Sequence, residues 1–383
     1  MQKTELPLPS SEAQAASEAL ENLIRTTIEA EGGQIPFSRF MELALYAPQY
    51  GYYTGGSHKI GAEGDFITAP VLSPLFAQTL AVQLNELLPQ TAGNVYEFGA
   101  GTGVLAAGLL NHIETGRLKN YYIIEVSPDL AERQHRYLLE HAPEAAGRVI
   151  HLSELPEQFD GVIIGNEVLD AMPVEIVKQL SDGLYRMGVK WDNGFQWQEM
   201  PANDSKLLEN AAQYLPPVSP YTSELHLAQY AFIRTLAERL VRGGLIMIDY
   251  GFDAAQYYHP QRNEGTLIGH YRHHTVHDPF FRVGLTDLTA HVNFTDIAQA
   301  GTDGGLDLIG YLPQSHFLLN LGITEQLEQT GSPDSSEYLR EAANLHKLIG
   351  QHEMGELFKV IAFGRNINED WRGFRFGDIC HKL

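Results

Sequence analysis

Three glycines and an acid lie between an apolar run and a helical stretch, in the segment Glu97-Phe98-Gly99-Ala100-Gly101-Thr102-Gly103. Glycines are needed where a tight turn brings the backbone close to a ligand, and a turn from a strand into a helix often holds a nucleotide. A dinucleotide site with the pattern Gly-x-Gly-x-x-Gly would need its third glycine at position 104, which is Val104. The spacing therefore favours a nucleotide-type ligand without a pyrophosphate.

Glu97, the acid at the end of the strand, indicates a ligand with a positively charged group. S-adenosylmethionine fits because its amino-acid tail carries an ammonium and a carboxylate, and the N-terminus of a helix favours an anion. Glu97 would hold the ammonium, directly or through water. Gly99, Gly101 and Gly103 would form the turn around the tail.

The next two strands end in acids that suit the rest of this ligand. Glu125 lies near the end of the predicted strand Tyr121–Val126, where doubly wound folds present a carboxylate to ribose hydroxyls. Glu154 follows the predicted strand Val149–Leu152, at a place where adenine could be bound. The alternative for each acid is a solvated side chain at a strand end, and for Glu154 both interpretations stay open.

Polar residues also follow the fourth predicted strand, Gly161–Gly165, as Asn166, Glu167 and Asp170. The carboxyl ends of parallel strands form the ligand crevice of an open sheet, so we expect these three residues near the reacting atoms. Carboxylates can orient a guanidinium through paired hydrogen bonds and localise its charge on the distant nitrogen. The alternative is that Glu167 and Asp170 cap a following helical turn.

Short apolar strands alternate with helices after Asn94, which predicts a doubly wound, mostly parallel α/β sheet. Three strand-like runs between residues 174 and 199 are separated by Asp-Gly and Asn-Gly turns, and they predict inserted antiparallel strands. We expect an N-terminal helical extension with cofactor-covering loops over residues 1–90 and the main domain over 91–383. Insertions at about 171–225 and 255–345 would form the substrate region, and the polar residues 325–345 would include an exposed loop.

Composition limits the class of partner. The chain has 383 residues, 44% of them hydrophobic, with 26 Lys and Arg against 48 Asp and Glu and a formal charge of −22. Such a charge disfavours a nucleic-acid partner and would attract a cationic substrate, although solubility alone could explain it. One cysteine, Cys380, makes a disulfide framework impossible. Without an apolar run of roughly 18 residues or a targeting segment, we expect a cytoplasmic protein that does not insert into a membrane.

The chain resembles the MidA-like family of S-adenosylmethionine-dependent methyltransferases from about Pro36 to Gly364. The segments that carry the resemblance are Leu45-Tyr46-x-Pro48-x-x-Gly51-Tyr52-Tyr53, Gly64–Pro70, Glu97–Gly103, Glu125-Val126-Ser127, Asn166-Glu167-x-x-Asp170-Ala171-x-Pro173-Val174, Asp249-Tyr250-Gly251 and Asp287-Leu288-Thr289-Ala290-His291-Val292-x-Phe294. The resemblance implies a class I (Rossmann-like) methyltransferase fold with inserted elements and S-adenosyl-L-methionine as methyl donor. For the mitochondrial members it implies symmetric dimethylation of an arginine in a respiratory complex I subunit.

The same resemblance assigns further residues. It implies that Asp65 and Thr68 touch the cofactor and that Arg272, His273 and His291 belong to the substrate side. Tyr50 belongs to a cluster of tyrosines that would either cover the cofactor or pack against the sheet. Asn293 departs from the aspartate usual in the family, which would affect the substrate if that carboxylate holds it. The histidines near residue 273 match a family stretch that is not a metal motif, so we expect no metal.

Three hypotheses follow. The first is a methyltransferase that modifies an arginine of a protein, whose identity the sequence does not give. The second is a S-adenosylmethionine-binding assembly factor that acts by holding a partner protein. The third, a dinucleotide-dependent oxidoreductase, is disfavoured by Val104. The sequence leaves a homodimer open.

Overall fold

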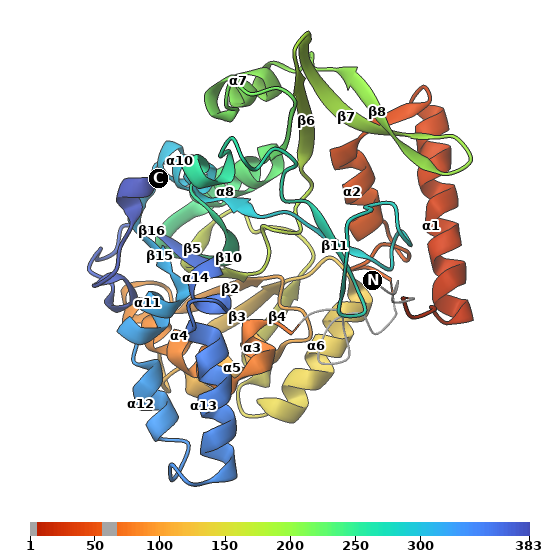
Figure 1. The fold of residues 1–383 in the computed structure, drawn as a ribbon. Helices are drawn as coiled ribbons and strands as arrows, with labels where there is room; N and C mark the ends of the chain where they lie inside the picture. The colour runs from red at the N-terminus through yellow and green to blue at the C-terminus, as the bar shows by residue number, and fades with distance from the viewer. Residues whose placement is uncertain (1–5, 56–66) are drawn as a thin grey trace. The chain divides into compact units, whose positions relative to one another are not determined.

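The computed structural model describes residues 6–55 and 67–383, which fall into two compact units (Figure 1). Unit 1 takes the described residues of Met1–Phe66, Asp170–Gln229 and Ala254–His291, and unit 2 takes Ile67–Leu169, Tyr230–Asp253 and Val292–Leu383. The predicted boundary at residue 90 and the predicted limits of the insertions stay predictions. Among the described residues, no helix is long and apolar enough to cross a membrane.

Unit 2 is built on one large sheet. Its strands, in spatial order, are β15 (Asp307–Pro313), β16 (Phe358–Arg365), β10 (Leu240–Phe252), β5 (Phe159–Asn166), β2 (Asn94–Phe98), β3 (Asn120–Ile124) and β4 (Val149–Leu152), with the short β14 (Val292–Asn293) beside β10. Strands β10, β5, β2, β3 and β4 are mutually parallel, whereas β16 runs antiparallel to both β10 and β15. The prediction of a doubly wound, mostly parallel sheet is confirmed.

The helices of unit 2 pack against this sheet and against one another. They are α3 (Ala69–Leu72), α4 (Pro74–Leu87), α5 (Val104–His112), α6 (Pro128–His141), most of α8 (Leu227–Arg239), α10 (Phe294–Asp303), α11 (Gln314–Asn320), α12 (Ile323–Glu328), α13 (Ser336–Ile349) and α14 (Met354–Leu357). All five residues of β2 are buried, as expected for a parallel strand covered on both faces. Phe98 of β2 meets Phe232 of α8 edge to face, whereas Val95 joins the cluster around α4 and α5.

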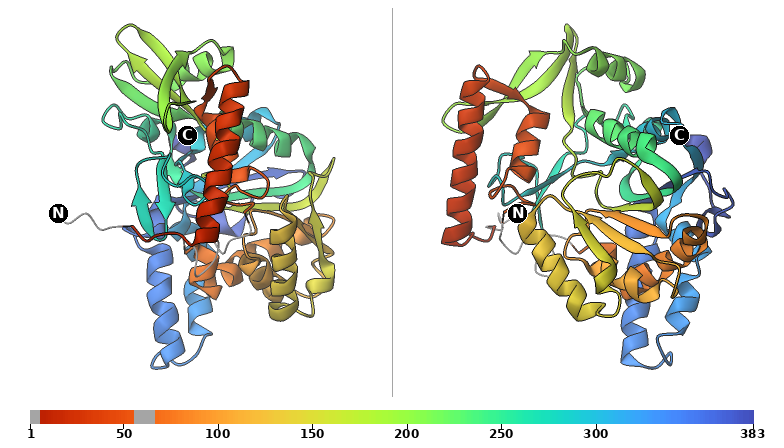
Figure 2. Two further views of the ribbon diagram at one scale, coloured as in Figure 1. Left: turned by 90° about the vertical axis from the view of Figure 1, so that its right-hand side faces the viewer. Right: turned by 180° about the vertical axis from the view of Figure 1, so that it is seen from behind.

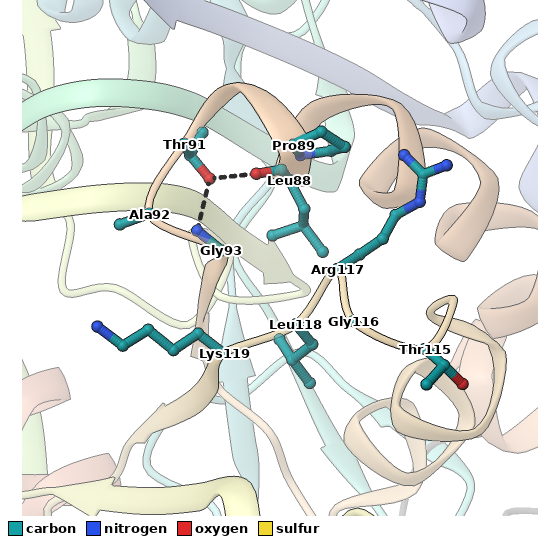
Figure 3. A pocket seen from close by; sticks show the side chains of 10 residues that line it. All are labelled: Leu88, Pro89, Thr91, Ala92, Gly93, Thr115, Gly116, Arg117, Leu118 and Lys119. Carbon is teal, nitrogen blue, oxygen red and sulfur yellow. Dashed lines mark hydrogen bonds between the residues drawn. The ribbon is translucent and has the colours of Figure 1, made fainter.

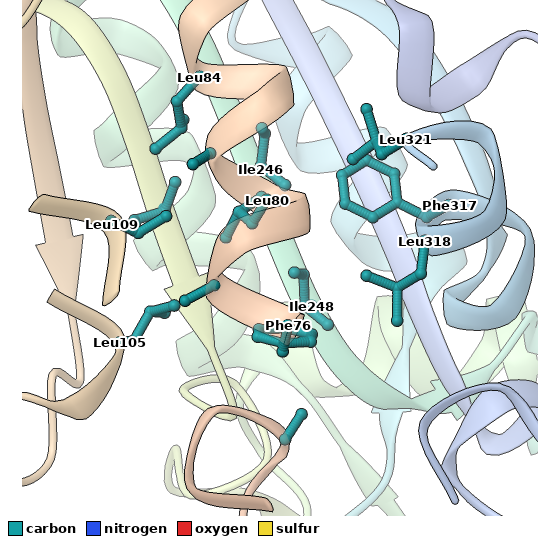
Figure 4. Packing of buried hydrophobic residues seen from close by; sticks show 14 of the residues in the cluster. Phe76, Leu80, Leu84, Leu105, Leu109, Ile246, Ile248, Phe317, Leu318 and Leu321 are labelled. Carbon is teal, nitrogen blue, oxygen red and sulfur yellow. The ribbon is translucent and has the colours of Figure 1, made fainter. Parts of the chain in front are cut away.

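The core of unit 2 depends on apolar residues at helical spacing. Phe76, Leu80 and Leu84 of α4 recur every four residues and pack with leucines of α5 and isoleucines of β10 (Figure 4). Burial of each such side chain stabilises the fold by about 1.5–3 kcal/mol. A Cβ on Gly108 would lie 2.4 Å from that of Ala77, so a glycine is what lets α5 approach α4 closely. This packing fixes the start of α5, which the glycine-rich turn precedes.

Unit 1 contains two antiparallel sheets. The larger has β1 (Gln34–Pro36), β7 (Gly183–Trp191), β6 (Glu175–Leu180) and β9 (Tyr221–Leu225), with β8 (Phe195–Pro201) also paired to β7; the smaller has β12 (His274–Val276), β11 (Ile268–Tyr271) and β13 (Asp287–Thr289). The helices are α1 (Ser11–Ala30), α2 (Phe37–Tyr46), α7 (Ser205–Tyr214) and α9 (Ala254–Tyr257). The predicted hairpins are confirmed, because β6 pairs β7 and β7 pairs β8, both antiparallel. Leu20, Ile24 and Ile28 form the buried side of α1, the long red helix of Figure 2.

The exposed loop expected within residues 325–345 is confirmed, and a helix that the sequence did not reveal follows it. The loop around residues 331–335 is present, but α13 (Ser336–Ile349) follows it and buries Glu341, Leu345 and Leu348. Ser335 caps this helix, because its Oγ accepts a hydrogen bond from the backbone N–H of Tyr338 at 3.1 Å. The many charged residues on the solvated face of α13 concealed a narrow apolar stripe.

Candidate cofactor site and catalytic residues

The three glycines of the turn after β2 all have left-handed backbone conformations. Their φ angles are 65° at Gly99, 54° at Gly101 and 90° at Gly103. This region is strained for residues with a side chain, and a Cβ on Gly99 would lie 2.7 Å from Cγ2 of Val168. Gly103 is the N-cap of α5 and has no side chain to bond the first N–H groups of the helix. The N-terminus of α5 is thus open to a ligand carboxylate.

Glu97 is buried at the end of β2, with 1% of its surface exposed. One carboxylate oxygen accepts a hydrogen bond of 2.7 Å from the hydroxyl of Tyr121 on β3. Burial raises the pKa of Glu97 to about 7, and the Tyr121 hydrogen bond offsets part of that rise. A nearby ammonium would favour its ionised form.

Glu125 lies one residue beyond the end of β3 and is partly buried. Its carboxylate accepts hydrogen bonds from the backbone N–H of Ser127 at 2.8 Å and from Nε2 of Gln134 at 3.1 Å. Val126 beside it is 65% exposed, an apolar surface next to an acid. Glu154 is exposed in the loop after β4 and makes no hydrogen bond or ion pair with the part of the chain that the structure describes.

The end of β5 holds two of the predicted catalytic residues. Nδ2 of Asn166 donates to Oε1 of Glu167 at 3.1 Å. Oδ1 of Asn166 is buried and has no hydrogen-bond partner among residues 6–55 and 67–383. Glu167 has a φ of 53°, a left-handed conformation that is rare outside glycine and concentrates at functional sites. A strained acid beside an unpaired buried amide oxygen is suited to a ligand that donates hydrogen bonds.

Asp249 of β10, to which sequence reasoning gave no role, holds this turn in place. Its Oδ2 accepts from the backbone N–H groups of Val168 at 3.1 Å and Leu169 at 2.9 Å, and its Oδ1 accepts from Tyr250 at 2.9 Å. Bends and a turn follow Glu167, and no helix begins between it and β6, so the alternative that Glu167 and Asp170 cap a helical turn stays a prediction. The carboxylate of Asp249, on the parallel strand β10, accepts hydrogen bonds from the backbone N–H groups of this turn.

The remaining predicted residues lie in several places. Asp170 belongs to unit 1 and is buried, and its carbonyl accepts from the N–H of Ala290 at 3.0 Å. Thr68 precedes α3, and its carbonyl accepts from Val71 and Leu72. Asp65 lies outside the described residues.

The tyrosine cluster of unit 1 is packed together. Tyr46 stacks on Tyr53 at 5.5 Å, and the Tyr53 hydroxyl donates to both carboxylate oxygens of Asp287 at 3.0 and 3.1 Å. Burial, with Asp287 beside it, raises the pKa of Tyr53 well above its usual value. Tyr50 is partly buried and, like Tyr46 and Tyr53, packs against the apolar core of unit 1. This packing lies within unit 1 itself.

Three residues predicted on the substrate side lie in loops of unit 1. Arg272 and His273 form the exposed turn between β11 and β12 with φ angles of 48° and 62°, and Arg272 donates to the carbonyl of Leu8 at 3.0 Å. The backbone N–H of His291 donates to Oγ1 of Thr266 at 3.0 Å. Within the described ranges, no three His, Cys, Asp or Glu side chains are grouped to hold a metal ion.

Asn293 is the residue that departs from the family pattern. It is fully buried and is the N-cap of α10, where its Oδ1 accepts from the N–H of Thr295 at 3.2 Å. Asparagine and aspartate cap helices about equally well, so this departure leaves the cap intact.

A cavity of about 520 Å³ lies near the amino ends of β2 and β3, and Figure 3 shows the residues that line it. Its lining includes Gly93 and Lys119, which directly precede β2 and β3. Ligands of open parallel sheets bind beyond the carboxyl ends of the strands, whereas this cavity lies at the amino ends. The cavity is therefore separate from the cofactor site.

The residues at the carboxyl ends of β2 and β3 fit S-adenosylmethionine. The open helix N-terminus suits its carboxylate, the buried Glu97 its ammonium and Glu125 its ribose hydroxyls. Hydrogen bonds within the protein hold both carboxylates in place without a ligand, Glu97 through Tyr121 and Glu125 through Ser127 and Gln134. The donor and acceptor types thus match a ligand with an amino-acid tail and a ribose.

Comparisons with known proteins agree with this chemistry. A family model described as a putative S-adenosyl-L-methionine-dependent methyltransferase matches residues 75–312. A mitochondrial protein arginine methyltransferase NDUFAF7 homolog from Drosophila melanogaster is 28% identical, over 94% of this chain and 87% of its own. The Danio rerio protein arginine methyltransferase NDUFAF7 is 26% identical, over 86% of this chain and 83% of its own.

Solved structures give a closer match. A Burkholderia thailandensis protein crystallised with S-adenosyl-homocysteine is 46% identical, with a TM-score of 0.94 and coverage of 99% of this chain and 100% of its own. A native structure from the same organism matches with a TM-score of 0.92, 46% identity and the same coverage. The predicted family resemblance and cofactor are confirmed. The chain belongs to this family of S-adenosyl-L-methionine-dependent methyltransferases, and S-adenosyl-L-methionine is its methyl donor.

Proposed function

We propose that this methyltransferase modifies the side chain of an arginine in a protein. The relatives from Drosophila melanogaster and Danio rerio are named protein arginine methyltransferases. The net charge of −22 favours a cationic substrate. The observation that carries the proposal is the strained Glu167 beside Asn166. Both follow the carboxyl end of β5, and ligands of open parallel sheets bind beyond such strand ends.

The proposed cofactor residues divide between the parts of the methyl donor. The turn of Gly99, Gly101 and Gly103 would receive the carboxylate at the start of α5, and Glu97 would hold the ammonium. Glu125 would hold the ribose. Further contacts are proposed for the exposed Glu154 and for Thr68 and Asp65, the last two from the family resemblance.

The proposed catalytic residues act on the acceptor. Bound S-adenosyl-L-methionine supplies a methyl group on a positively charged sulfur. The carboxylate of Glu167 would pair with the guanidinium, draw its positive charge toward the nitrogens that it contacts and accept the proton that is lost on methylation. The buried Oδ1 of Asn166 would accept a second N–H. Asp170 would add negative charge to the same acceptor.

The acceptor's own protein would meet unit 1. Tyr50, Arg272, His273 and His291 are the proposed contacts, and all four belong to this unit. From the family resemblance we propose that the partner is a subunit connected with assembly of respiratory complex I. A homodimer and a cytoplasmic location stay predictions.

The test is transfer of labelled methyl groups from S-adenosyl-L-methionine in a lysate of cells that lack this protein. Added wild-type protein should label one protein band, and mass spectrometry should place the label on arginine. Glu167→Gln should leave the band unlabelled. Label found only in small molecules or nucleic acid would refute a protein arginine as acceptor.

The same variant separates catalysis from scaffolding. A protein that works by holding a partner needs no methyl transfer, so Glu167→Gln would still support growth or complex assembly in the cell. A catalytic role predicts that both methyl transfer and cellular function disappear while binding of S-adenosyl-homocysteine persists.

A further inference from the structure

Gln134 is a polar residue in the buried stripe of α6. The buried side of this helix is formed by Leu130, Gln134 and Leu138, at a spacing of four residues. Gln134 has none of its surface exposed, although an apolar residue would suit its place between two leucines. A buried amide is unfavourable unless its hydrogen bonds are made, so its partners explain its presence.

The Gln134 side chain makes three hydrogen bonds. Its Nε2 donates to the carbonyl of Gly101 at 3.0 Å and to Oε2 of Glu125 at 3.1 Å, and its Oε1 lies 3.1 Å from Nε2 of His151 on β4. A carbonyl and an ionised carboxylate can only accept, so the amide nitrogen must face them and the flipped amide is excluded. His151 therefore carries its proton on Nε2 and donates it to Gln134.

These bonds connect the glycine turn after β2 with the acid after β3. Gly103 also lies next to Gln134, since a Cβ on Gly103 would be in van der Waals contact with it, 3.7 Å from its Cα and 3.8 Å from its Cβ. The turn would receive the amino-acid tail of the methyl donor, and Glu125 would receive its ribose. Gln134 thus contacts both halves of the proposed cofactor site.

We propose that Gln134 is a positioning residue for the methyl donor, whose amide fixes the glycine turn and Glu125 at the separation that the tail and ribose require. The inference rests on the proposed roles of the turn and of Glu125. It adds a single residue through which the two subsites depend on each other, and His151 fixes the orientation of that residue.

The pKa of Glu125 can separate a positioning role of Gln134 from a packing role. A purely packing role would leave this pKa, and the pH dependence of cofactor binding, unchanged. Burial raises the pKa of Glu125, and the N–H of Ser127, the amide of Gln134 and the charge of Arg133 each lower it. His151 contacts Oε1 of Gln134, and burial lowers the pKa of this histidine, which favours its neutral form near pH 7. Loss of the amide raises the pKa of Glu125 further, so the carboxylate is lost at a higher pH.

The experiment measures S-adenosyl-homocysteine binding by calorimetry between pH 8 and pH 4.5, a range that reaches down to the usual pKa of the Glu125 carboxyl. Gln134→Met, of similar length but without a donor, should weaken binding by about tenfold at pH 8. Its affinity relative to the wild type should fall further as the pH is lowered. Gln134→Glu should behave in the opposite way, because two facing carboxylates repel at pH 8, whereas a carboxyl that takes up a proton at the acidic end of the range donates a hydrogen bond again. Ratios to the wild type remove the titration of Glu97.

Two further variants make the outcome decisive. Leu130→Met alters the same buried stripe and should lower the unfolding temperature without changing affinity. Glu125→Gln should weaken binding; if it does not, the proposed role of Glu125 is wrong. If it does, but Gln134→Met and Gln134→Glu bind like the wild type or show ratios that do not vary with pH, the positioning role is overturned. If Gln134→Met does not fold, the pH trend of Gln134→Glu alone decides.

Discussion

The hydroxyl of Tyr121 on β3 donates a 2.7 Å hydrogen bond to the buried carboxylate of Glu97 on β2. The two strands are paired in parallel, so neighbouring strands supply both the acid and its donor. The acid is therefore fixed in place before the cofactor binds. It is also left with a proton affinity that depends on its burial.

This burial predicts that stability falls as the pH rises from about 4.5 to about 7. The pKa of Glu97 rises from its usual 4.5 to about 7, so the native state holds the proton more tightly than the unfolded chain. The contribution is fully present below pH 4.5 and is lost as the pH rises through about 7, a change of about 3 kcal/mol. Glu97→Gln should remove this pH dependence from thermal unfolding of the ligand-free protein. Equal slopes for variant and wild type would contradict it.

The glycine turn should tolerate no side chain at its first position. Gly99→Ala forces a Cβ into a left-handed residue and to 2.7 Å from Val168, at a cost of about 1–2 kcal/mol from the backbone alone. We expect a measurable loss of S-adenosyl-homocysteine affinity by calorimetry. Gly147→Ala is the matched control, because its Cβ would meet nothing within 4 Å and its φ is unstrained. Equal affinities for the two variants would show that the turn does not bind the cofactor.

Strain at Glu167 should appear as a difference between two variants that both lack the carboxylate. Gly in a left-handed conformation avoids the steric cost that Ala retains, so Glu167→Gly should be about 1–2 kcal/mol more stable than Glu167→Ala. Both should lose methyl transfer. Denaturant unfolding measures the difference, and equal stabilities would mean that position 167 is unstrained.

Asp249 should be needed for the turn that carries Glu167. Its two oxygens accept from three backbone N–H groups, and an amide can offer only one oxygen to them. Asp249→Asn should lower the unfolding free energy by about 2–3 kcal/mol and reduce methyl transfer as well. Asp334→Asn, at an exposed loop residue, should change neither. An unaffected Asp249→Asn protein would mean that the turn does not depend on the carboxylate.

The parts of the fold that the sequence predicted are those whose signal lies within a few consecutive residues. Strand β4 (Val149–Leu152) and the hairpins around residues 181 and 193 follow from apolar runs and turn residues that are close in the sequence. Helix α13 was missed because its buried stripe is narrow and its other side is charged. The glycine turn was predictable for the same reason as β4, because the residues that define it are consecutive in the sequence.

Other parts of the candidate site could not be predicted in this way. Gln134 and Asp249 act through partners that lie 33 and 81 residues away in sequence. Their residue types are ordinary for a helix and for the end of a strand, so only three-dimensional pairing reveals them. The positive φ of Glu167 has no sequence signature, because such conformations are usually marked by glycine or asparagine.

Transfer of a methyl group from S-adenosyl-L-methionine to a protein arginine, with Glu167 acting on the acceptor, is the activity that we propose for this protein. The most direct measurement incubates the purified protein with labelled S-adenosyl-L-methionine and the acceptor protein, then hydrolyses the product and separates its amino acids. Label should appear in methylarginine with the wild type and be absent with Glu167→Gln, while both bind S-adenosyl-homocysteine with similar affinity. Undiminished labelling by Glu167→Gln, or label in any residue other than arginine, would contradict the claim.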